Sequence, residues 1–195
     1  MIGKTALHYF GVLFGSEQPH TQTSEAERAV LRKYLRGMKR VVEIGVFEGF
    51  TTRVLAESSD DDAVVYGIDP FFPGRLGISW GMLTAKKHTK QYRARGKVRF
   101  VRALSAEVGD RVPTAVDYVF IDGDHSLSGI TTDWAFWKGR LESKGIIALH
   151  DTLLTPDKPK GYTLGSIEYF RDHIRNDSRF EIVAQRDSLS VLRKR

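Results

Sequence analysis

Two apolar segments of this chain each lead into acidic and imidazole side chains. Residues 116–122 form an apolar run that closes on a carboxylate and continues into Asp124 and His125. Residues 146–149 are also apolar and are followed directly by His150-Asp151. Carboxylates and imidazoles can exchange protons near neutral pH and can bind divalent cations. The two segment ends therefore indicate a reaction centre, provided that the fold brings them together.

Short apolar runs alternate with helical patterns from residue 40 onward, which is typical of parallel β-α-β units. The carboxyl ends of such strands meet at one edge of the sheet, where open α/β folds bind their ligands. The predicted strands are Arg40–Gly45, Ala63–Asp69, Lys97–Val101, Val116–Asp122 and Gly145–His150, and the predicted helices between them are Gly49–Ser58, Met82–Arg95 and Ser126–Glu142.

The two ends of the chain add helices and a hairpin. Ser24 and Glu27 have the spacing of a capping box, which predicts a helix that stops near Gly37. A further helix is expected over Leu164–Ile174. The strands expected at 180–184 and 188–192 are joined by a tight polar turn, and so short a connection requires an antiparallel hairpin.

These elements predict an α/β fold of the Rossmann-like, three-layer type. Its mostly parallel sheet would have seven strands and would end in the antiparallel hairpin. With 195 residues the chain is expected to form one domain, in which a helical segment at residues 1–38 packs on a core of residues 39–195.

Composition excludes several classes of protein. The chain is 41% hydrophobic and has no cysteine, so disulfides and thiolate metal sites are ruled out. No apolar run approaches the roughly 18 residues of a membrane span, and a cytoplasmic protein is expected. The net charge of +6 comes from scattered Lys and Arg without interleaved aromatic residues, so nucleic acid is not the expected partner.

A glycine turn follows the first predicted strand. Gly45 and Gly49 are spaced G-x-x-x-G, and Phe47 stands where the dinucleotide pattern requires a second glycine. Glu43, just before the turn, would repel phosphate and suits a cationic or hydroxyl-bearing ligand. Asp69 ends the next strand and is placed to accept hydrogen bonds from ribose hydroxyls. Taken alone, the glycines could also form an ordinary strand-to-helix turn.

The loop, Asp69 and the terminal hairpin together resemble the class I S-adenosylmethionine-dependent methyltransferases. The resemblance covers residues 27–193 and implies S-adenosylmethionine as the cofactor. It implies that Asp69 holds the ribose and that Leu104 and Ser105 border the adenine. The residues implied to line the methionine end are Glu43, Gly45, Phe47, Gly49 and Thr51, and Asp122 also borders the cofactor.

Within that superfamily, residues 120–125 and 148–151 look most similar to the small O-methyltransferases. These include relatives of catechol O-methyltransferase and the group of sugar O-methyltransferases and cephalosporin hydroxylase-like proteins. The resemblance implies a divalent metal, Mg²⁺ or Mn²⁺, held by Asp122, His150 and Asp151. His150 departs from the carboxylate or amide usual in these relatives, and it broadens the choice of metal. His125 aligns with their general base.

Each of these residues also has a simpler interpretation. Asp122 could cap the turn that follows it, and Asp124 is expected to be the helix cap in either case. His150-Asp151 could be a hydrogen-bonded strand end without metal. His125 could position a substrate by hydrogen bonding without moving a proton.

The expected function is metal-assisted O-methylation of a small hydroxylated acceptor. The alternatives are an N- or RNA methyltransferase, whose Asn/Asp-Pro-Pro-Tyr/Phe signature the chain lacks, and a non-catalytic S-adenosylmethionine-binding module. Residues 71–80 could form a lid or acceptor wall, or a surface loop. The lysines of residues 152–162 could attract an anionic acceptor. A homodimer is a possible assembly.

Overall fold

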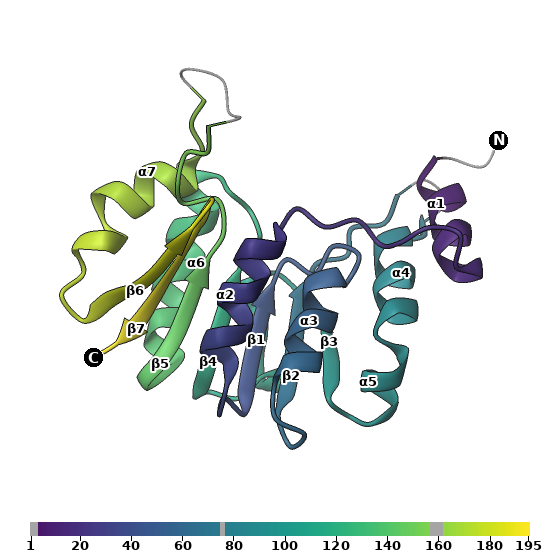
Figure 1. The fold of residues 1–195 in the computed structure, drawn as a ribbon, viewed down its shortest axis with the longest axis horizontal. Coiled ribbons are helices and arrows are strands. Elements are labelled where there is room, and N and C mark those ends of the chain that lie inside the picture. The colour runs from purple at the N-terminus through teal and green to yellow at the C-terminus, as the bar shows by residue number, and fades with distance from the viewer. Residues whose placement is uncertain (1–3, 75–76, 157–161) are drawn as a thin grey trace.

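A computed structural model describes residues 4–74, 77–156 and 162–195, and its centre is a seven-stranded sheet (Figure 1). The strand order is β3-β2-β1-β4-β5-β7-β6, in which β7 runs in the direction opposite to that of the other six strands. This arrangement confirms the predicted α/β fold with its terminal hairpin. The strands are β1 (Arg40–Ile44), β2 (Val64–Asp69), β3 (Val98–Arg102), β4 (Val116–Ile121), β5 (Leu141–Leu149), β6 (Phe180–Arg186) and β7 (Leu189–Lys194).

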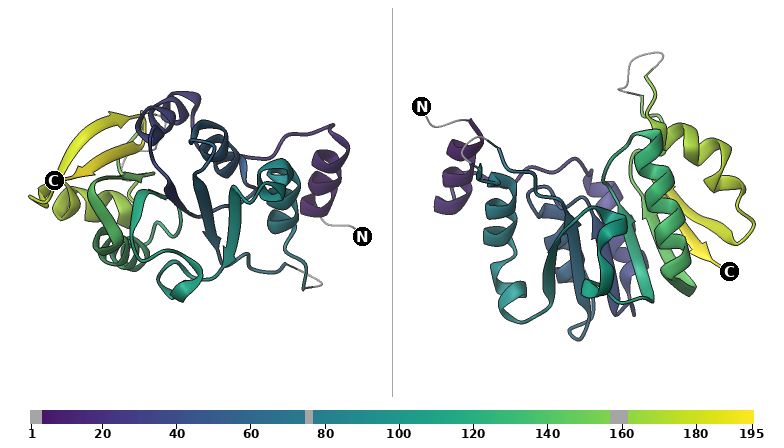
Figure 2. Two further views of the ribbon diagram at one scale, coloured as in Figure 1. Left: turned by 90° about the horizontal axis from the view of Figure 1, so that it is seen from below. Right: turned by 180° about the vertical axis from the view of Figure 1, so that it is seen from behind.

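Helices cover both faces of the sheet (Figure 2). One face packs Val41, Val65 and Phe120 against α2 and α3, and the other packs alternate strand residues against α6 and α7. The alternation follows from the two-residue period of a strand, because both faces of a parallel sheet are buried. The helices are α1 (Lys4–Phe14), α2 (Glu25–Leu35), α3 (Phe50–Ser58), α4 (Trp80–His88), α5 (Lys90–Ala94), α6 (Leu127–Arg140) and α7 (Gly165–Asp172), with short 3₁₀ turns at Ser105–Glu107, Gly109–Arg111 and Ile174–Asn176.

The strand register brings four strand ends to one edge. Ile44 at the end of β1 pairs with Ile68 of β2 and with Ile121 of β4. Ile121 pairs in turn with Leu149 at the end of β5. The residues that follow these four strands therefore lie next to one another, as the sequence predicts for a reaction centre.

The N-terminal segment contributes two helices that make different contacts. Leu31 and Leu35 of α2 are fully buried against the sheet. Helix α1 packs instead against α4, at the end of the molecule opposite the terminal hairpin (Figure 1). Helix α1 was not predicted individually, because no capping pattern or long apolar stripe marks it.

Two predicted elements differ from the observed ones. The helix expected over Met82–Arg95 is divided into α4 and α5 at Thr89, whose hydroxyl donates a hydrogen bond to the Ala85 carbonyl. Strand β5 begins at Leu141, so Glu142, predicted to be helical, belongs to the strand. Leu141 already pairs with Val116 of β4, and this pairing ends α6 earlier than the sequence pattern suggests.

Across the part of the chain that the structure describes, no helix is both long and apolar enough to span a membrane.

Candidate functional site

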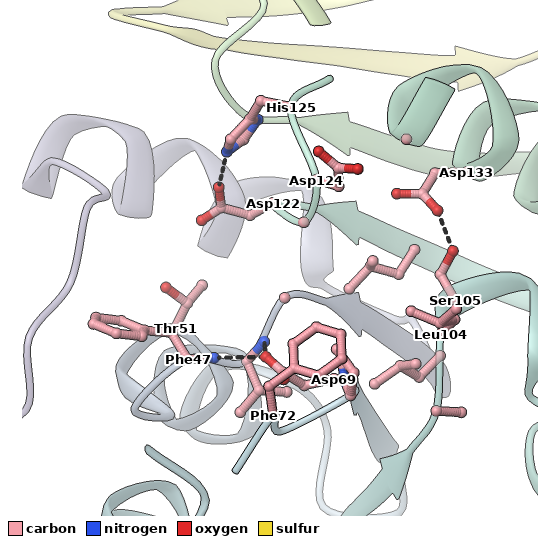
Figure 3. Close-up of a pocket in the computed structure, with 18 of the residues that line it drawn as sticks. Phe47, Thr51, Asp69, Phe72, Leu104, Ser105, Asp122, Asp124, His125 and Asp133 are labelled. Atoms are coloured by element: carbon pink, nitrogen blue, oxygen red, sulfur yellow. Dashed lines mark hydrogen bonds and ion pairs between the residues drawn. The ribbon is translucent and has the colours of Figure 1, made fainter. Parts of the chain in front are cut away.

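A cavity of about 800 Å³ opens at the carboxyl ends of β1, β2 and β4 (Figure 3). This volume lies within the usual range of small-molecule and cofactor sites. Predicted site residues that line it are Gly45, Phe47, Thr51, Asp69, Leu104, Ser105, Asp122 and His125. Glu43, Gly49, His150 and Asp151 are not in its wall. The structure thus brings most of the predicted cofactor residues into one cavity.

The backbone between β1 and α3 wraps around the carboxylate of Asp69. The amides of Val46 and Phe47 donate hydrogen bonds to Asp69 Oδ2 at 3.0 and 3.1 Å, and the Phe71 amide donates to Oδ1 at 2.6 Å. A carboxylate offers about four acceptor positions, so Asp69 retains capacity for a ligand hydroxyl. The predicted contact with ribose stays a prediction, but Asp69 already shapes the loop without a ligand.

The two loop glycines are required mainly by close contacts within the protein. Both have positive φ, 86° at Gly45 and 78° at Gly49. A Cβ on Gly45 would lie 2.0 Å from the Asp122 carbonyl oxygen, and one on Gly49 would lie 2.9 Å from Ala85 Cα of α4. Gly45 therefore lets the ends of β1 and β4 approach, and Gly49 lets α4 approach α3.

Glu43 lies beneath the cavity. Its side chain is fully buried and accepts a hydrogen bond from the Thr52 hydroxyl, while Glu43 Oε1 has no partner among the described residues. Burial raises the pKa of Glu43 well above its usual value, and the nearby carboxylates of Asp122 and Asp69 add to this effect. The contact with Thr52 links the end of β1 to the first turn of α3.

The opposite wall of the cavity contains a second buried carboxyl group, which sequence reasoning missed. Asp133 of α6 is 5% exposed and accepts a hydrogen bond from the Ser105 hydroxyl (Figure 3). Burial raises its pKa to about 6, although the Ser105 contact acts in the opposite direction. The burial of Asp133 could have been predicted from its position, because Asp133 lies on the same helix face as the core residues Ile130 and Trp137.

Asp122, His125, His150 and Asp151 form one cluster beside the cavity. Asp122 Oδ1 lies 3.0 Å from His150 Nδ1 and 3.5 Å from His125 Nε2. Asp151 Oδ2 lies 3.7 Å from His125 Nε2 and 3.8 Å from His150 Nδ1. The structure therefore brings together the three predicted metal ligands and the predicted base.

The side chain of Glu27 contacts His150 on the Nε2 side of the ring, opposite the Nδ1 atom that faces Asp122. Glu27 Oε2 lies 3.3 Å from His150 Nε2 and also accepts the Ser24 amide of the predicted capping box, while Oε1 accepts the amide and hydroxyl of Ser188. Glu27 is 2% exposed. The capping box was visible in the sequence, whereas the reach of Glu27 to His150 required the packing of α2 against the terminal hairpin.

The charged side chains of this cluster shift one another's pKa values. Burial alone would lower the pKa of His150, but the carboxylates of Asp122 and Glu27 raise it to about 10. Burial alone would raise the pKa of Asp122, but the imidazoles of His125 and His150 lower it to about 2. In the ligand-free protein the cluster thus carries a positive imidazolium next to ionised carboxylates.

The donor atoms of the cluster fit a divalent cation. Asp122 Oδ1 and His150 Nδ1 are buried and make no hydrogen bond of proper geometry with any described residue, despite their short separation. Ligand atoms of Asp122, His125 and His150 all lie within 4.8 Å of one another. The Glu27–His150 contact is the kind of outer carboxylate that orients a metal-binding imidazole.

Asp124 has a different role from the expected helix cap. Ser126 is the N-cap of α6, and its hydroxyl accepts the Gly129 amide. The Asp124 carboxylate accepts hydrogen bonds from the amide and the hydroxyl of Ser126. Asp124 therefore holds the cap residue in place from two positions earlier in the chain.

The N-terminal segment also reaches the cavity, which the sequence did not predict. His20, Thr21 and Gln22, between α1 and α2, lie in its wall together with Phe72 of the predicted lid. Phe72 is 76% exposed, which leaves its ring available to a ligand. Residues 75–76 and 157–161 of the two predicted substrate loops, including Lys158 and Lys160, lie outside the described residues.

Comparisons with known proteins identify similar chains. A family model described as a methyltransferase domain matches residues 42–152. An uncharacterized protein of Acanthamoeba polyphaga mimivirus is 28% identical over 116 residues, which are 56% of this chain and 50% of that protein. The chain thus spans about half the length of the curated relative it matches.

Two solved structures show the same fold. A "putative caffeoyl-CoA O-methyltransferase" from Staphylococcus aureus superposes with a TM-score of 0.72 at 13% identity, covering 99% of this chain and 93% of its own. An O-methyltransferase from Bacillus cereus, solved in complex with SAH, gives a TM-score of 0.68 at 13% identity and covers 99% and 91% of the two chains.

Proposed function

This chain belongs to the methyltransferase-domain family whose model it matches, and from that premise we propose that it transfers a methyl group from S-adenosylmethionine to a hydroxyl oxygen of a small acceptor. One observation supports oxygen as the atom that accepts the methyl group. The cluster of Asp122, His125, His150 and Asp151 stands at the cavity edge and combines cation ligands with a proton acceptor. Both solved relatives bear O-methyltransferase names, which is consistent with this proposal.

The charge of the cavity suits a cationic cofactor. Its described lining includes the carboxylates of Asp69, Glu107, Asp122, Asp124 and Asp133 and contains no Lys or Arg. When bound, S-adenosylmethionine supplies a methyl group that is already activated on a sulfonium sulfur. The protein then needs mainly to orient the reactants and to accept a proton. The same acidic lining favours a neutral or cationic acceptor over a phosphorylated one.

Thr51, Asp69 and Ser105 are the side chains proposed to position the cofactor. Asp69 would accept ribose hydroxyls with its remaining acceptor positions, while its bonds to Val46 and Phe47 keep the loop in shape. Leu104 and Ser105, on the far wall, would border the adenine. Phe47 lines the cavity and is 51% exposed, so its ring is available to cover the bound methionine end.

Asp122, His150 and Asp151 are the residues proposed to hold a divalent cation. Such an ion would lower the pKa of an acceptor hydroxyl and stabilise its oxyanion. Carboxylates alone suit Mg²⁺, and the imidazole of His150 shifts the preference toward Mn²⁺. The convergence of Asp122 Oδ1 and His150 Nδ1, which are buried and 3.0 Å apart, supports this assignment.

His125 is the proposed proton acceptor. Its Nε2 lies near Asp122 and Asp151, whose negative charges would stabilise the imidazolium that forms. The acceptor proton would pass to His125 as the acceptor oxygen bonds to the methyl carbon and the bond from carbon to sulfur breaks. Because His125 is only partly buried, the proton can then leave to solvent.

Calorimetry with S-adenosylmethionine and S-adenosylhomocysteine, with and without Mn²⁺, tests this proposal. We expect both ligands to bind, and we expect Asp122→Asn to bind one Mn²⁺ ion fewer than the wild type, whereas Asp124→Asn, its matched control on the same loop, should bind as many as the wild type. Acceptor screening by mass gain of one methyl group then identifies the substrate. Absence of binding by both ligands would contradict the methyltransferase proposal, whereas binding without any metal effect would contradict only the metal-assisted mechanism.

A further inference from the structure

A second group of imidazole and carboxylate side chains lies outside the proposed reaction centre. His8 of α1 and His20 of the following segment both contact Glu48, which lies in the loop between β1 and α3. His8 Nε2 is 2.9 Å from Glu48 Oε2, and His20 Nδ1 is 3.3 Å from Glu48 Oε1. The His20 amide also donates to Glu48 Oε2 at 2.6 Å. Two histidines from separate segments thus converge on the carboxylate of Glu48.

The geometry of this group suits ion binding better than a simple surface salt bridge. The side chains of His8 and Glu48 are only 11% and 9% exposed. The rings of His8 and His20 are stacked with centroids 3.9 Å apart, and one ligand atom from each of the three residues lies within 4.8 Å of the others. Two imidazole nitrogens and a carboxylate oxygen at this spacing form a common donor set for zinc.

A second carboxylate orients His8. Its Nδ1 contacts Glu17 Oε2, on the side of the ring away from Glu48. A proton held on Nδ1 by Glu17 leaves Nε2 free to bind a cation, which is how outer carboxylates prepare metal-binding histidines. The same relation links Glu27 to His150 in the other cluster.

We infer that His8, His20 and Glu48 form a binding site for a divalent transition-metal ion of the Zn²⁺ class, with Glu17 orienting His8. The fourth tetrahedral position would be taken by water. This site shares no residue with the Asp122 cluster, so it does not depend on the proposed function.

An ion at this site would fasten the N-terminal segment over the cofactor cavity. The segment between α1 and α2 runs across the top of the sheet in Figure 1, and its residues His20, Thr21 and Gln22 line the cavity. Glu48 lies between the cavity residue Phe47 and Gly49, the N-cap of α3. The ion would therefore connect the wall of the cavity that residues 20–22 form to the loop between β1 and α3.

Counting bound zinc tests the inference. The full chain is stripped with EDTA, dialysed against dilute ZnCl₂, and its zinc content is measured by mass spectrometry. We expect His20→Ala to contain one zinc fewer than the wild type, and Asp122→Asn/His20→Ala to contain one fewer than Asp122→Asn. The second pair makes the result independent of the Asp122 cluster. His20 has a 64% exposed side chain, so its replacement leaves the core intact.

Three further measurements test whether the zinc is bound by His8, His20 and Glu48 and not elsewhere. Glu17→Gln should weaken zinc binding by about 10- to 100-fold, as expected for loss of an orienting carboxylate. His173→Ala, which removes an exposed histidine outside both clusters, should leave the zinc content unchanged. In Asp122→Asn, zinc should slow amide hydrogen exchange over residues 15–24, and this effect should vanish with His20→Ala. Equal zinc content within both pairs of variants would overturn the inference.

Discussion

At the scale of single residues, Glu27 connects three parts of the protein that are distant in sequence. Its carboxylate caps α2 through Ser24, holds the turn of the terminal hairpin through Ser188, and contacts His150 of the candidate reaction centre. Burial alone would raise the pKa of Glu27, but its contacts with His150, Ser24 and Ser188 lower it to about 2. The same group therefore stabilises the fold and orients a proposed metal ligand.

Glu27→Gln is expected to reduce the free energy of unfolding by roughly 3 kcal/mol, because it removes one of the two carboxylates closest to the buried imidazolium of His150 and leaves Asp122 as the other. The depressed pKa of Glu27 makes its stabilisation present above about pH 4.5 and lost as the pH falls toward 2. The raised pKa of His150 makes the stabilisation fade as the pH rises from about 6.5 toward 10. The difference between variant and wild type, measured by urea unfolding, should thus be largest near pH 5–6.

Glu25→Gln is the matched control, since Glu25 is on the same helix but its side chain is 68% exposed and pairs with Arg28 and Arg32 at the surface. Its removal should have little effect, as is usual for exposed ion pairs. Equal effects of the two substitutions would show that the contact of Glu27 with His150 contributes nothing.

The contribution of Asp133 to the free energy of unfolding should depend on pH with a sign opposite to that of Glu27. The pKa of Asp133 is raised to about 6, so the unfolded chain releases this proton at lower pH than the folded chain does. Wild-type stability should therefore fall between about pH 4 and pH 6, and Asp133→Asn should remove that fall while still accepting the Ser105 hydroxyl. A shift of about two pKa units corresponds to at most roughly 3 kcal/mol of stability that is present below about pH 4 and lost above about pH 6. The measurement is urea unfolding of both proteins from pH 4 to pH 8.

The exposed Asp110 supplies the comparison for that experiment. Asp110→Asn should track the wild type across the pH range. If Asp133→Asn did the same, Asp133 would not titrate as a buried group in the folded protein.

At the scale of elements, the β1–α3 loop shows how local conformation and close packing combine. Gly45→Ala places a methyl group 2.0 Å from the Asp122 carbonyl oxygen on a backbone with φ of 86°. Gly96→Ala meets a similar φ of 74° with no atom within 4 Å of the new Cβ. Gly96→Ala, the control, should lower the free energy of unfolding by about 1–2 kcal/mol, because alanine is strained in the left-handed conformation. Gly45→Ala should lose more than about 3 kcal/mol in urea unfolding, because the clash adds to it. Similar losses in both variants would contradict the packing argument.

Sequence reasoning found most elements but not all of their boundaries. The strands were predictable because their apolar runs end in glycine, proline or charged residues, as in Val64–Asp69 before Pro70. The division of α4 from α5 depends on the Thr89 hydroxyl, which competes for a carbonyl, and the early start of β5 depends on pairing with Val116. Both are decided by contacts that a single segment does not contain.

The candidate site follows the same rule. Asp122, His125, His150 and Asp151 were predictable because they directly follow strands whose ends meet. Glu27 and His20 contact the site from helices and segments whose docking no local pattern specifies. The sequence therefore predicts site residues whose positions follow from the sheet topology. It does not predict site residues that contact the site only because a helix or segment packs against it.

At the scale of the whole molecule, the sheet and α1 are separate units of packing. Neither of the two large core clusters on the sheet contains a residue of α1. Helix α1 contacts α4 instead, where Trp80 packs against Tyr9 and Phe10 with ring centroids 5.5 and 6.2 Å apart. The cavity nevertheless depends on α1, because His8 of this helix helps to hold the segment that carries His20.

Deletion of residues 1–14 should therefore leave a folded sheet with a weakened cavity. We expect one cooperative unfolding transition, an unchanged β-sheet signal in circular dichroism, and a red-shifted fluorescence contribution from the uncovered Trp80. The affinity for S-adenosylhomocysteine, measured by calorimetry, should fall by about tenfold, or 1.4 kcal/mol. The point variant His8→Gln keeps α1 and should account for most of that loss, because it removes the imidazole that contacts Glu48 and stacks on His20, while Trp80 stays covered. Loss of the sheet signal after the deletion would show that α1 belongs to the folding core, and unchanged affinity in both proteins would show that the His20 segment does not contribute to the cofactor site.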